Sequence, residues 1–138
     1  MLAKDKEAFD TPCRTSGALI QEVLHRADAK LVISSSWRRS GIAECANILG
    51  DAGIRNRLHD DWRTEVVGGC PRAVEILSWV AEHDVEEWIA IDDMHMPLPE
   101  QNFVQCTLDD GFLMQHYIEA CTKLGVLAFD PPPEVKKL

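Results

Sequence analysis

The sequence lacks the segments that mark membrane and secreted proteins. No apolar run approaches the roughly 20 residues that a membrane-spanning helix requires. The N-terminal stretch MLAKDKEAFD has no apolar segment of the kind found in secretory signals. We therefore expect a cytoplasmic protein without a membrane segment.

Paired cysteines and a basic surface are also missing. The five cysteines are widely spaced and include no C-x-x-C pair, so the sequence predicts neither a disulfide framework nor a zinc ribbon. Basic residues number 14 and acidic residues 23, which gives a formal net charge of −9. This charge disfavours extensive binding to nucleic acid, because phosphate backbones are held by lysine and arginine. A small phosphorylated substrate held by one local cluster is compatible with it.

The composition is that of one ordinary globular domain. Apolar residues make up 46% and charged residues 27% of the 138 residues, within the normal range for a folded domain. A chain of this length can bury a single core. We predict one domain over residues 1–138, with residues 131–138 as a tail.

Short apolar runs alternate with helical patterns along the chain. Runs without polar alternation predict strands covered on both faces. The expected strands cover residues 30–34, 88–91, 103–106 and 126–130; the expected helices cover residues 16–28 and 42–52, the segment from Pro71 and residues 111–124. Residues 54–69 are predicted to be irregular. This alternation predicts an α/β fold with a doubly wound parallel sheet, in which ligands bind at the carboxyl ends of the strands.

The first polar cluster follows the strand predicted at residues 30–34. Ser34 and Ser35 can offer hydroxyl and backbone N–H groups to phosphate oxygens at the start of a helix. The guanidinium of Arg38 can donate two hydrogen bonds to the same phosphate. The alternative interpretation is a turn and helix cap with a solvated arginine.

The second polar cluster follows the strand predicted at residues 88–91. Asp92 and Asp93 would present two carboxylates, which are suitable ligands for Mg²⁺; the alternative is that they only cap the loop. Arg72 lies at the start of a predicted helix, where the helix dipole disfavours a cation unless an anion is near. Its position therefore points to a phosphate or carboxylate neighbour, although an exposed arginine would also fit.

Taken together, the phrases SSSWR, RAVEILSWV and WIAIDDM resemble the haloacid dehalogenase-like (HAD) hydrolase superfamily, most closely its small domains in RNA-repair-type proteins. The resemblance runs from about residue 9 to residue 112. It implies a Mg²⁺-dependent phosphatase that works through a phosphoaspartyl intermediate. By this resemblance Ser34, or failing that Ser35, contacts the phosphoryl group, Arg72 offsets negative charge, and Asp92 and Asp93 hold Mg²⁺.

The sequence departs from that family at its first motif. An apolar strand ending in D-x-D-G, which carries the nucleophile, is expected before residue 9 and is not found there. Three explanations stay open: a shortened chain, an edge strand and tail at residues 126–133 in which Asp130 takes no part in the site, or a circular permutation. In the permuted arrangement residues 126–130 are the central strand and Asp130 is the nucleophile. Pro132 would then replace the second aspartate, so the general acid would be lost.

Two hypotheses on function follow. The first is a HAD-like phosphatase whose catalysis is compromised. The second is a noncatalytic phosphate-binding or regulatory module that kept the fold. An unfilled central strand position would also favour a homodimer formed through exposed sheet edges.

Overall fold

Strands and helices alternate along the chain in the computed structural model, which describes residues 14–34, 57–65, 69–107 and 111–131. The order is α2 (Arg14–Ala27), β1 (Leu31–Ile33), β2 (Leu58–Arg63), α5 (Arg72–Glu82), β3 (Ala90–Asp92), the 3₁₀ helix η2 (Glu100–Asn102), β4 (Phe103–Gln105) and α6 (Met114–Lys123). The predicted helix at residues 42–52 lies outside the described residues. No described helix is long and apolar enough to cross a membrane.

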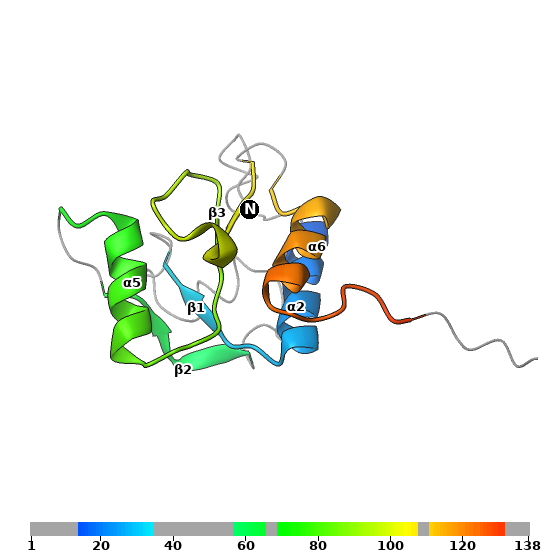
Figure 1. Cartoon of the computed structure of the whole chain (residues 1–138), viewed down its shortest axis with the longest axis horizontal. Helices are drawn as coiled ribbons and strands as arrows, with labels where there is room; N and C mark the ends of the chain where they lie inside the picture. The colour runs from blue at the N-terminus through cyan, green and yellow to red at the C-terminus, as the bar shows by residue number, and fades with distance from the viewer. Residues whose placement is uncertain (1–13, 35–56, 66–68, 108–110, 132–138) are drawn as a thin grey trace, which may run out of the picture.

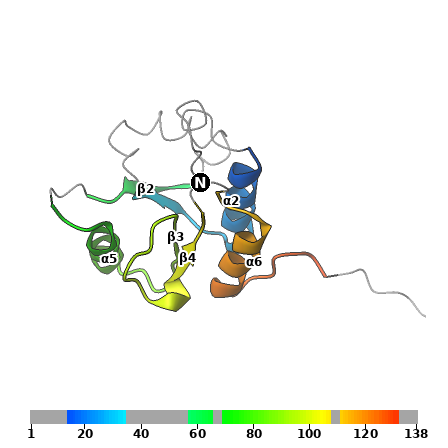
Figure 2. The same ribbon diagram turned by 90° about the horizontal axis from the view of Figure 1, so that it is seen from above.

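The described strands form two parallel pairs. β1 pairs with β2, and β3 pairs with β4 in the register Ala90↔Phe103 and Asp92↔Gln105. Helices α2 and α6 lie side by side on one flank of the strands, and α5 lies on the other (Figures 1 and 2). The prediction of an α/β fold with parallel strands is confirmed. A single continuous sheet is not formed, because no ladder joins the two pairs within the described residues.

The strand β2 contradicts the prediction that residues 54–69 are irregular. Its sequence, LHDDWR, is mostly polar, and only Leu58 is buried. It pairs with β1 alone among the described strands, so it lies at an edge, where charged side chains are tolerated and protect the edge from pairing with other chains. Such a strand carries no apolar run by which the sequence could predict it.

The strand predicted at residues 126–130 is not formed, so that prediction is wrong. These residues have no strand or helix structure, and they lie beside α2 and α6 rather than between β1 and β3. Leu127 and Phe129 are 66% and 57% exposed. The permuted arrangement is therefore not found in this structure.

Two helix ends follow simple local chemistry. At the start of α6 the imidazole Nδ1 of His116 accepts a hydrogen bond of 2.9 Å from the Leu113 N–H, which would otherwise have no partner in the helix. At its end Gly125 has a φ of +72°, the left-handed conformation that commonly terminates a helix. The Lys123 ammonium donates to the carbonyls of Glu100 and Phe103, which attaches the end of α6 to the start of β4.

The core gathers where α2 and α6 pack against the strands. Val104, Phe112, Ala120 and Cys121 are fully buried there, together with Ile20, Val23, Leu24 and Tyr117. A smaller cluster joins α5 to β3 and to the loop that follows it, through Ala73, Ile76, Ala90 and Met96. The two clusters hold β3 from both flanks and fix the place where its carboxyl end emerges.

Candidate functional site

The carboxyl end of β3 carries a buried carboxylate with two donors. Asp92 is the last residue of β3, and its side chain is 8% exposed. Its Oδ2 accepts from Arg72 Nη1 at 2.8 Å, and its Oδ1 accepts from the Met94 N–H at 2.9 Å. Because a buried charge must be paired, these two donors allow Asp92 to stay ionised away from water.

The neighbouring carboxyls of Asp92 and Asp93 are shifted in opposite directions. Burial raises the pKa of Asp92, but hydrogen bonds from Met94, Asp93 and Arg72 outweigh it, so the pKa lies below its usual value. Burial, followed by the hydrogen bond to Asp92, raises the pKa of Asp93. The pair thus has one carboxylate that holds its charge firmly and one that takes up a proton more readily.

Arg72 reaches Asp92 because α5 begins at that residue. Pro71 precedes the helix in an extended conformation, which is typical of a residue that flanks a helix start. The anionic neighbour predicted from the position of Arg72 is confirmed, and it is the carboxylate of Asp92. The guanidinium is 26% exposed, so part of it remains accessible to a ligand.

Ser34 follows β1 directly and lies at its carboxyl end, as predicted. It is half-buried and lines a cavity of about 470 Å³ that also borders Ile89, Ala90 and Ile91 of β3 and the residues before it. Both β1 and β3 run in the same direction in Figure 1, so their carboxyl ends, with Ser34 and Asp92, lie at the same edge. Ser35 and Arg38 lie outside the described residues.

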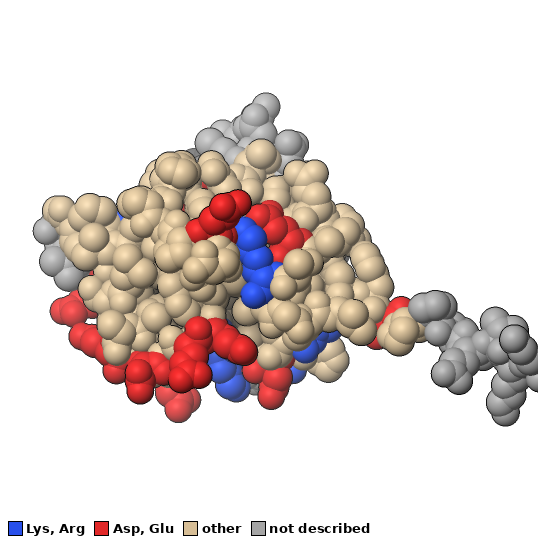
Figure 3. Space-filling view, in the orientation of Figure 1, with Lys and Arg blue, Asp and Glu red and all other residues tan. Residues whose placement is uncertain are grey.

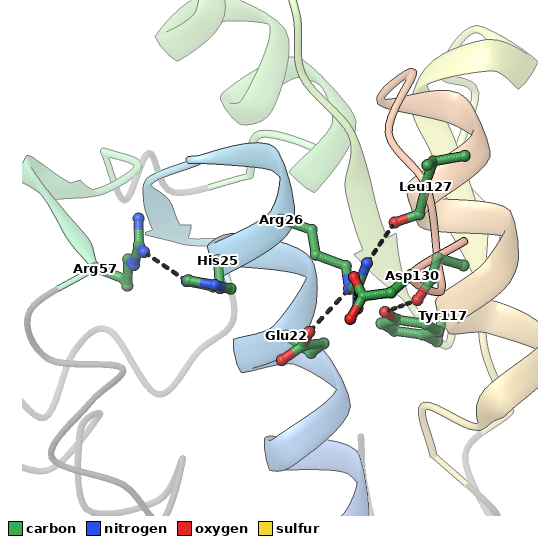
Figure 4. Close-up of polar contacts among 8 residues, drawn as sticks. Glu22, His25, Arg26, Arg57, Tyr117, Leu127 and Asp130 are labelled. Carbon is green, nitrogen blue, oxygen red and sulfur yellow. Dashed lines mark hydrogen bonds and ion pairs between the residues drawn. The ribbon is translucent and has the colours of Figure 1, made fainter. Parts of the chain in front are cut away.

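Asp130 is placed apart from this group. Its side chain is 88% exposed, and Oδ1 pairs with Arg26 Nη2 at 3.2 Å. Figure 4 shows it beside the last turn of α2, where Arg26 also donates to the Leu127 carbonyl. Since Arg26 lies at the end of α2 that leads into β1, Asp130 is near the amino ends of the strands and Asp92 is at a carboxyl end.

Two residues of β4 and its continuation support the site and were not predicted from the sequence. The Cys106 N–H donates to the Asp92 carbonyl at 2.9 Å, and Gln105 Nε2 donates to the Asp93 carbonyl at 3.3 Å. Burial raises the pKa of the Cys106 thiol. Both contacts follow from the pairing of β3 with β4, which no local pattern in the sequence reveals.

The carboxylates of Asp92 and Asp93 could supply only part of the ligands of a magnesium ion. No group of three or more His, Cys, Asp or Glu side chains among the described residues is arranged to hold a metal. Mg²⁺, however, is usually bound by one or two carboxylates together with water and phosphate oxygens. A carboxylate offers about four lone pairs, so the three hydrogen bonds to Asp92 do not use all of its acceptor capacity. Asp92 and Asp93 therefore fit a Mg²⁺ site of this kind.

Comparison with known proteins identifies the family. Residues 3–117 match a family described as the HAD domain in Swiss Army Knife RNA repair proteins. The chain belongs to this HAD domain family. The match covers α2 to β4 and the first turn of α6, so the Arg72–Asp92 pair lies within the HAD domain. No curated protein and no solved structure matches the chain.

Proposed function

We propose that the carboxyl ends of β1 and β3 form the phosphate-binding and Mg²⁺-binding part of a HAD-type phosphomonoester hydrolase. The Arg72–Asp92 pair is the observation that carries the proposal, since it sets a partly exposed guanidinium against a carboxylate that keeps its charge. A cation and a metal-binding carboxylate beside each other are what phosphoryl transfer requires, because it depends mainly on positioning and charge neutralisation.

Each residue has a separate task in this proposal. Ser34 donates its hydroxyl to a phosphate oxygen, and Arg72 offsets charge on the phosphate while it holds Asp92 in place. Asp92 and Asp93 would hold Mg²⁺, which supplies charge neutralisation at the phosphoryl oxygens when it is bound. Ser35 and Arg38 would extend the phosphate site. The net charge of −9 favours a small phosphate ester over a polynucleotide as substrate.

A noncatalytic phosphate-binding module is the second candidate, and the place of Asp130 favours it. Hydrolysis by this family's chemistry needs an aspartate nucleophile, and the sequence offers Asp130 for that role. That carboxylate pairs with Arg26 beside α2 instead of meeting Arg72. A chain that binds phosphate without turnover would fit this arrangement.

Binding and turnover assays on the same variants separate the two candidates. Calorimetry with Mg²⁺ and inorganic phosphate is expected to show binding that Asp92→Asn abolishes and Asp28→Asn, a control at an exposed ion pair, leaves unchanged. Hydrolysis of 4-nitrophenyl phosphate then decides catalysis, and activity that is lost in Asp130→Asn as well as in Asp92→Asn would identify Asp130 as the nucleophile. Binding without turnover supports the module. Activity that survives Asp92→Asn contradicts both candidates.

A further inference from the structure

His83 connects the end of α5 to β2. It is the residue at which α5 ends, and its side chain is 22% exposed. Its Nδ1 lies 2.8 Å from the Trp79 carbonyl oxygen, and its Nε2 lies 2.9 Å from Asp61 Oδ2. Asp61 belongs to β2, which passes close to the last turn of α5 (Figure 1). One imidazole ring thus contacts both elements.

These two contacts determine how many protons the ring of His83 carries. A carbonyl oxygen and a carboxylate oxygen only accept hydrogen bonds, whereas a neutral imidazole has one N–H group and one bare nitrogen. Both contacts of His83 are hydrogen bonds only when both ring nitrogens carry a proton. The geometry therefore fits the imidazolium, which is also the form that makes an ion pair with Asp61.

The indole of Trp79 suits the same form of His83. The two rings are stacked, with centroids 3.9 Å apart and an interplanar angle of 14°. A cation over the face of an indole is attracted by its π-electrons. Because Trp79 is buried, its ring is a fixed surface for the imidazolium.

The second histidine at this contact is held in a different form. The Nδ1 of His59 accepts a hydrogen bond of 2.9 Å from the Asp61 N–H, so that nitrogen carries no proton. The ring centroids of His59 and His83 are 5.5 Å apart, where two positive rings would repel each other. The hydrogen bonds thus assign the positive charge to His83. The charged residues nearest to this contact along the chain are exposed: Asp60 and Arg63 of β2, Glu82 of α5, and Asp84 and Glu86 of the segment that follows.

The part of β2 that His83 contacts is a bulge, residues 59–62. Residues 31–33 of β1 face the longer stretch 58–63 of β2, so the ladder between the two strands is interrupted there. The bulge therefore lacks the regular ladder bonds of a strand. Its Asp61 attaches it to α5 through the pair with His83.

The bulge is also close to the carboxyl end of β1. The Thr64 N–H donates to the Ile33 carbonyl at 3.1 Å, and Ser34 follows Ile33. Thr64 is three residues beyond Asp61, so movement of the bulge acts on this hydrogen bond. A change in the charge of His83 thus reaches the end of β1.

We propose that His83 is a pH switch that attaches the bulge of β2 to the end of α5. In its protonated form the ring makes both hydrogen bonds. Imidazole loses its charge between about pH 5 and 8, and a neutral ring keeps only one of the two bonds and turns a bare nitrogen toward the other oxygen. The bulge then opens more often, and the Thr64–Ile33 hydrogen bond opens with it. The inference does not depend on the proposed phosphate site.

Hydrogen–deuterium exchange of the Thr64 amide in the intact chain tests the switch. His83→Gln keeps a donor for Asp61 but does not titrate, and the ratio of its exchange rate to that of the parent cancels the intrinsic effect of pH. At pH 5.5 we expect the amide to exchange more slowly in the parent. Because Asp61 is 57% exposed, the difference should be about two- to fivefold.

This difference should disappear at pH 8, where the parent ring is neutral. His95→Gln, which replaces an exposed histidine in the loop after β3, is the matched control and should exchange like the parent at both pH values. A ratio of parent to His83→Gln rates that is the same at pH 5.5 and pH 8 would overturn the inference.

Nitrogen-15 NMR of the histidine rings provides a second test, on the unaltered protein. The signals of His83 are identified by their absence from the spectrum of His83→Gln. At pH 5.5 both of its ring nitrogens should carry protons, and at pH 8 only one should. A neutral His83 ring at pH 5.5 would overturn the inference, whatever the exchange rates of the variants.

Discussion

Arg72 and Asp92 form an ion pair in which the carboxylate is the more buried partner, with exposed side-chain fractions of 26% and 8%. Loss of the guanidinium would leave a buried charge with one donor fewer. We expect Arg72→Met to lower the free energy of unfolding by about 1–3 kcal/mol, measured by urea denaturation.

The exposed pair of Arg57 and Asp28 is the matched control for this substitution. Its nitrogen–oxygen distance is 3.0 Å, but the Asp28 side chain is 94% exposed. Arg57→Met should therefore cost no more than about 1 kcal/mol. Equal decreases in the free energy of unfolding for Arg72→Met and Arg57→Met would show that burial of Asp92 does not make its ion pair more stabilising than an exposed one.

The lowered pKa of Asp92 predicts how stability depends on acid. A folded pKa below the unfolded value of about 3.9 contributes stability that is fully present above that value. The contribution is lost as the pH falls through the lower folded pKa. Asp92→Asn lacks this contribution at neutral pH, so its urea midpoint should fall less than that of the parent between pH 5 and the acid limit. Urea midpoints that fall equally in the parent and in Asp92→Asn as the pH is lowered would contradict the lowered pKa of Asp92.

Asp93 should behave in the opposite sense, because its pKa is raised by burial and by Asp92. A raised carboxyl pKa contributes stability below the unfolded value, and that contribution disappears as the pH rises through the folded pKa. At pH 7 the parent therefore gains nothing from this ionised carboxylate. We expect the urea midpoint of Asp93→Asn at pH 7 to equal or exceed that of the parent.

The segment that follows α6 is held to two helices by a small set of polar contacts. Arg26 binds the Leu127 carbonyl and the Asp130 carboxylate, and the Tyr117 hydroxyl donates to the Ala128 carbonyl (Figure 4). We expect Arg26→Met to release the segment, so that chymotrypsin cleaves after Phe129 several times faster than in the parent. Glu22→Gln removes only the partner of Arg26 within α2 and serves as the control. Unchanged cleavage in Arg26→Met would mean that the Tyr117 hydrogen bond and the apolar contacts hold the segment without Arg26.

The sequence predicts best the strands that are covered by helices on both faces. β1 and β3 have short apolar runs because they are covered on both faces, and this pattern is local. β2 has no such run, since one edge of a sheet tolerates His59, Asp60 and Asp61. Residues 126–130 have a strand-like sequence, yet contacts with Arg26 and Tyr117 hold them beside the helices, so tertiary structure overrides local preference.

Part of the candidate site was predictable for a similarly local reason. Arg72 stands where a helix dipole disfavours it, and the polar residues Ser34 and Asp92 follow apolar runs; both patterns imply a ligand-binding edge. The contributions of Cys106 and Gln105 depend on which strand lies next to β3, and pairing between strands leaves no local signal. The position of Asp130 depends in the same way on the partner that Arg26 finds.

The charge of the molecule as a whole predicts a dependence on salt. The net charge is −9, and acidic side chains gather along the lower edge of the face shown in Figure 3. Four exposed acidic residues lie at the end of α5 and in the segment that leads to β3: Glu82, Asp84, Glu86 and Glu87. Raising the NaCl concentration from 10 to 150 mM shortens the Debye length from about 30 Å to about 8 Å. Weaker self-repulsion should raise the urea midpoint. A variant with Glu86→Gln and Glu87→Gln should show a smaller rise, and a midpoint that falls with salt would contradict this view.

Asp92 joins the candidate site to the fold, because its side chain binds Arg72 while its carbonyl accepts from the Cys106 N–H. Opening the end of the β3–β4 ladder therefore disturbs the carboxylate as well. The hydrogen–deuterium exchange rate of the Cys106 amide should consequently report on the site without any added label. A ligand that binds Asp92 would slow the exchange of the Cys106 amide, even if the frequency of local unfolding elsewhere in the domain stayed the same.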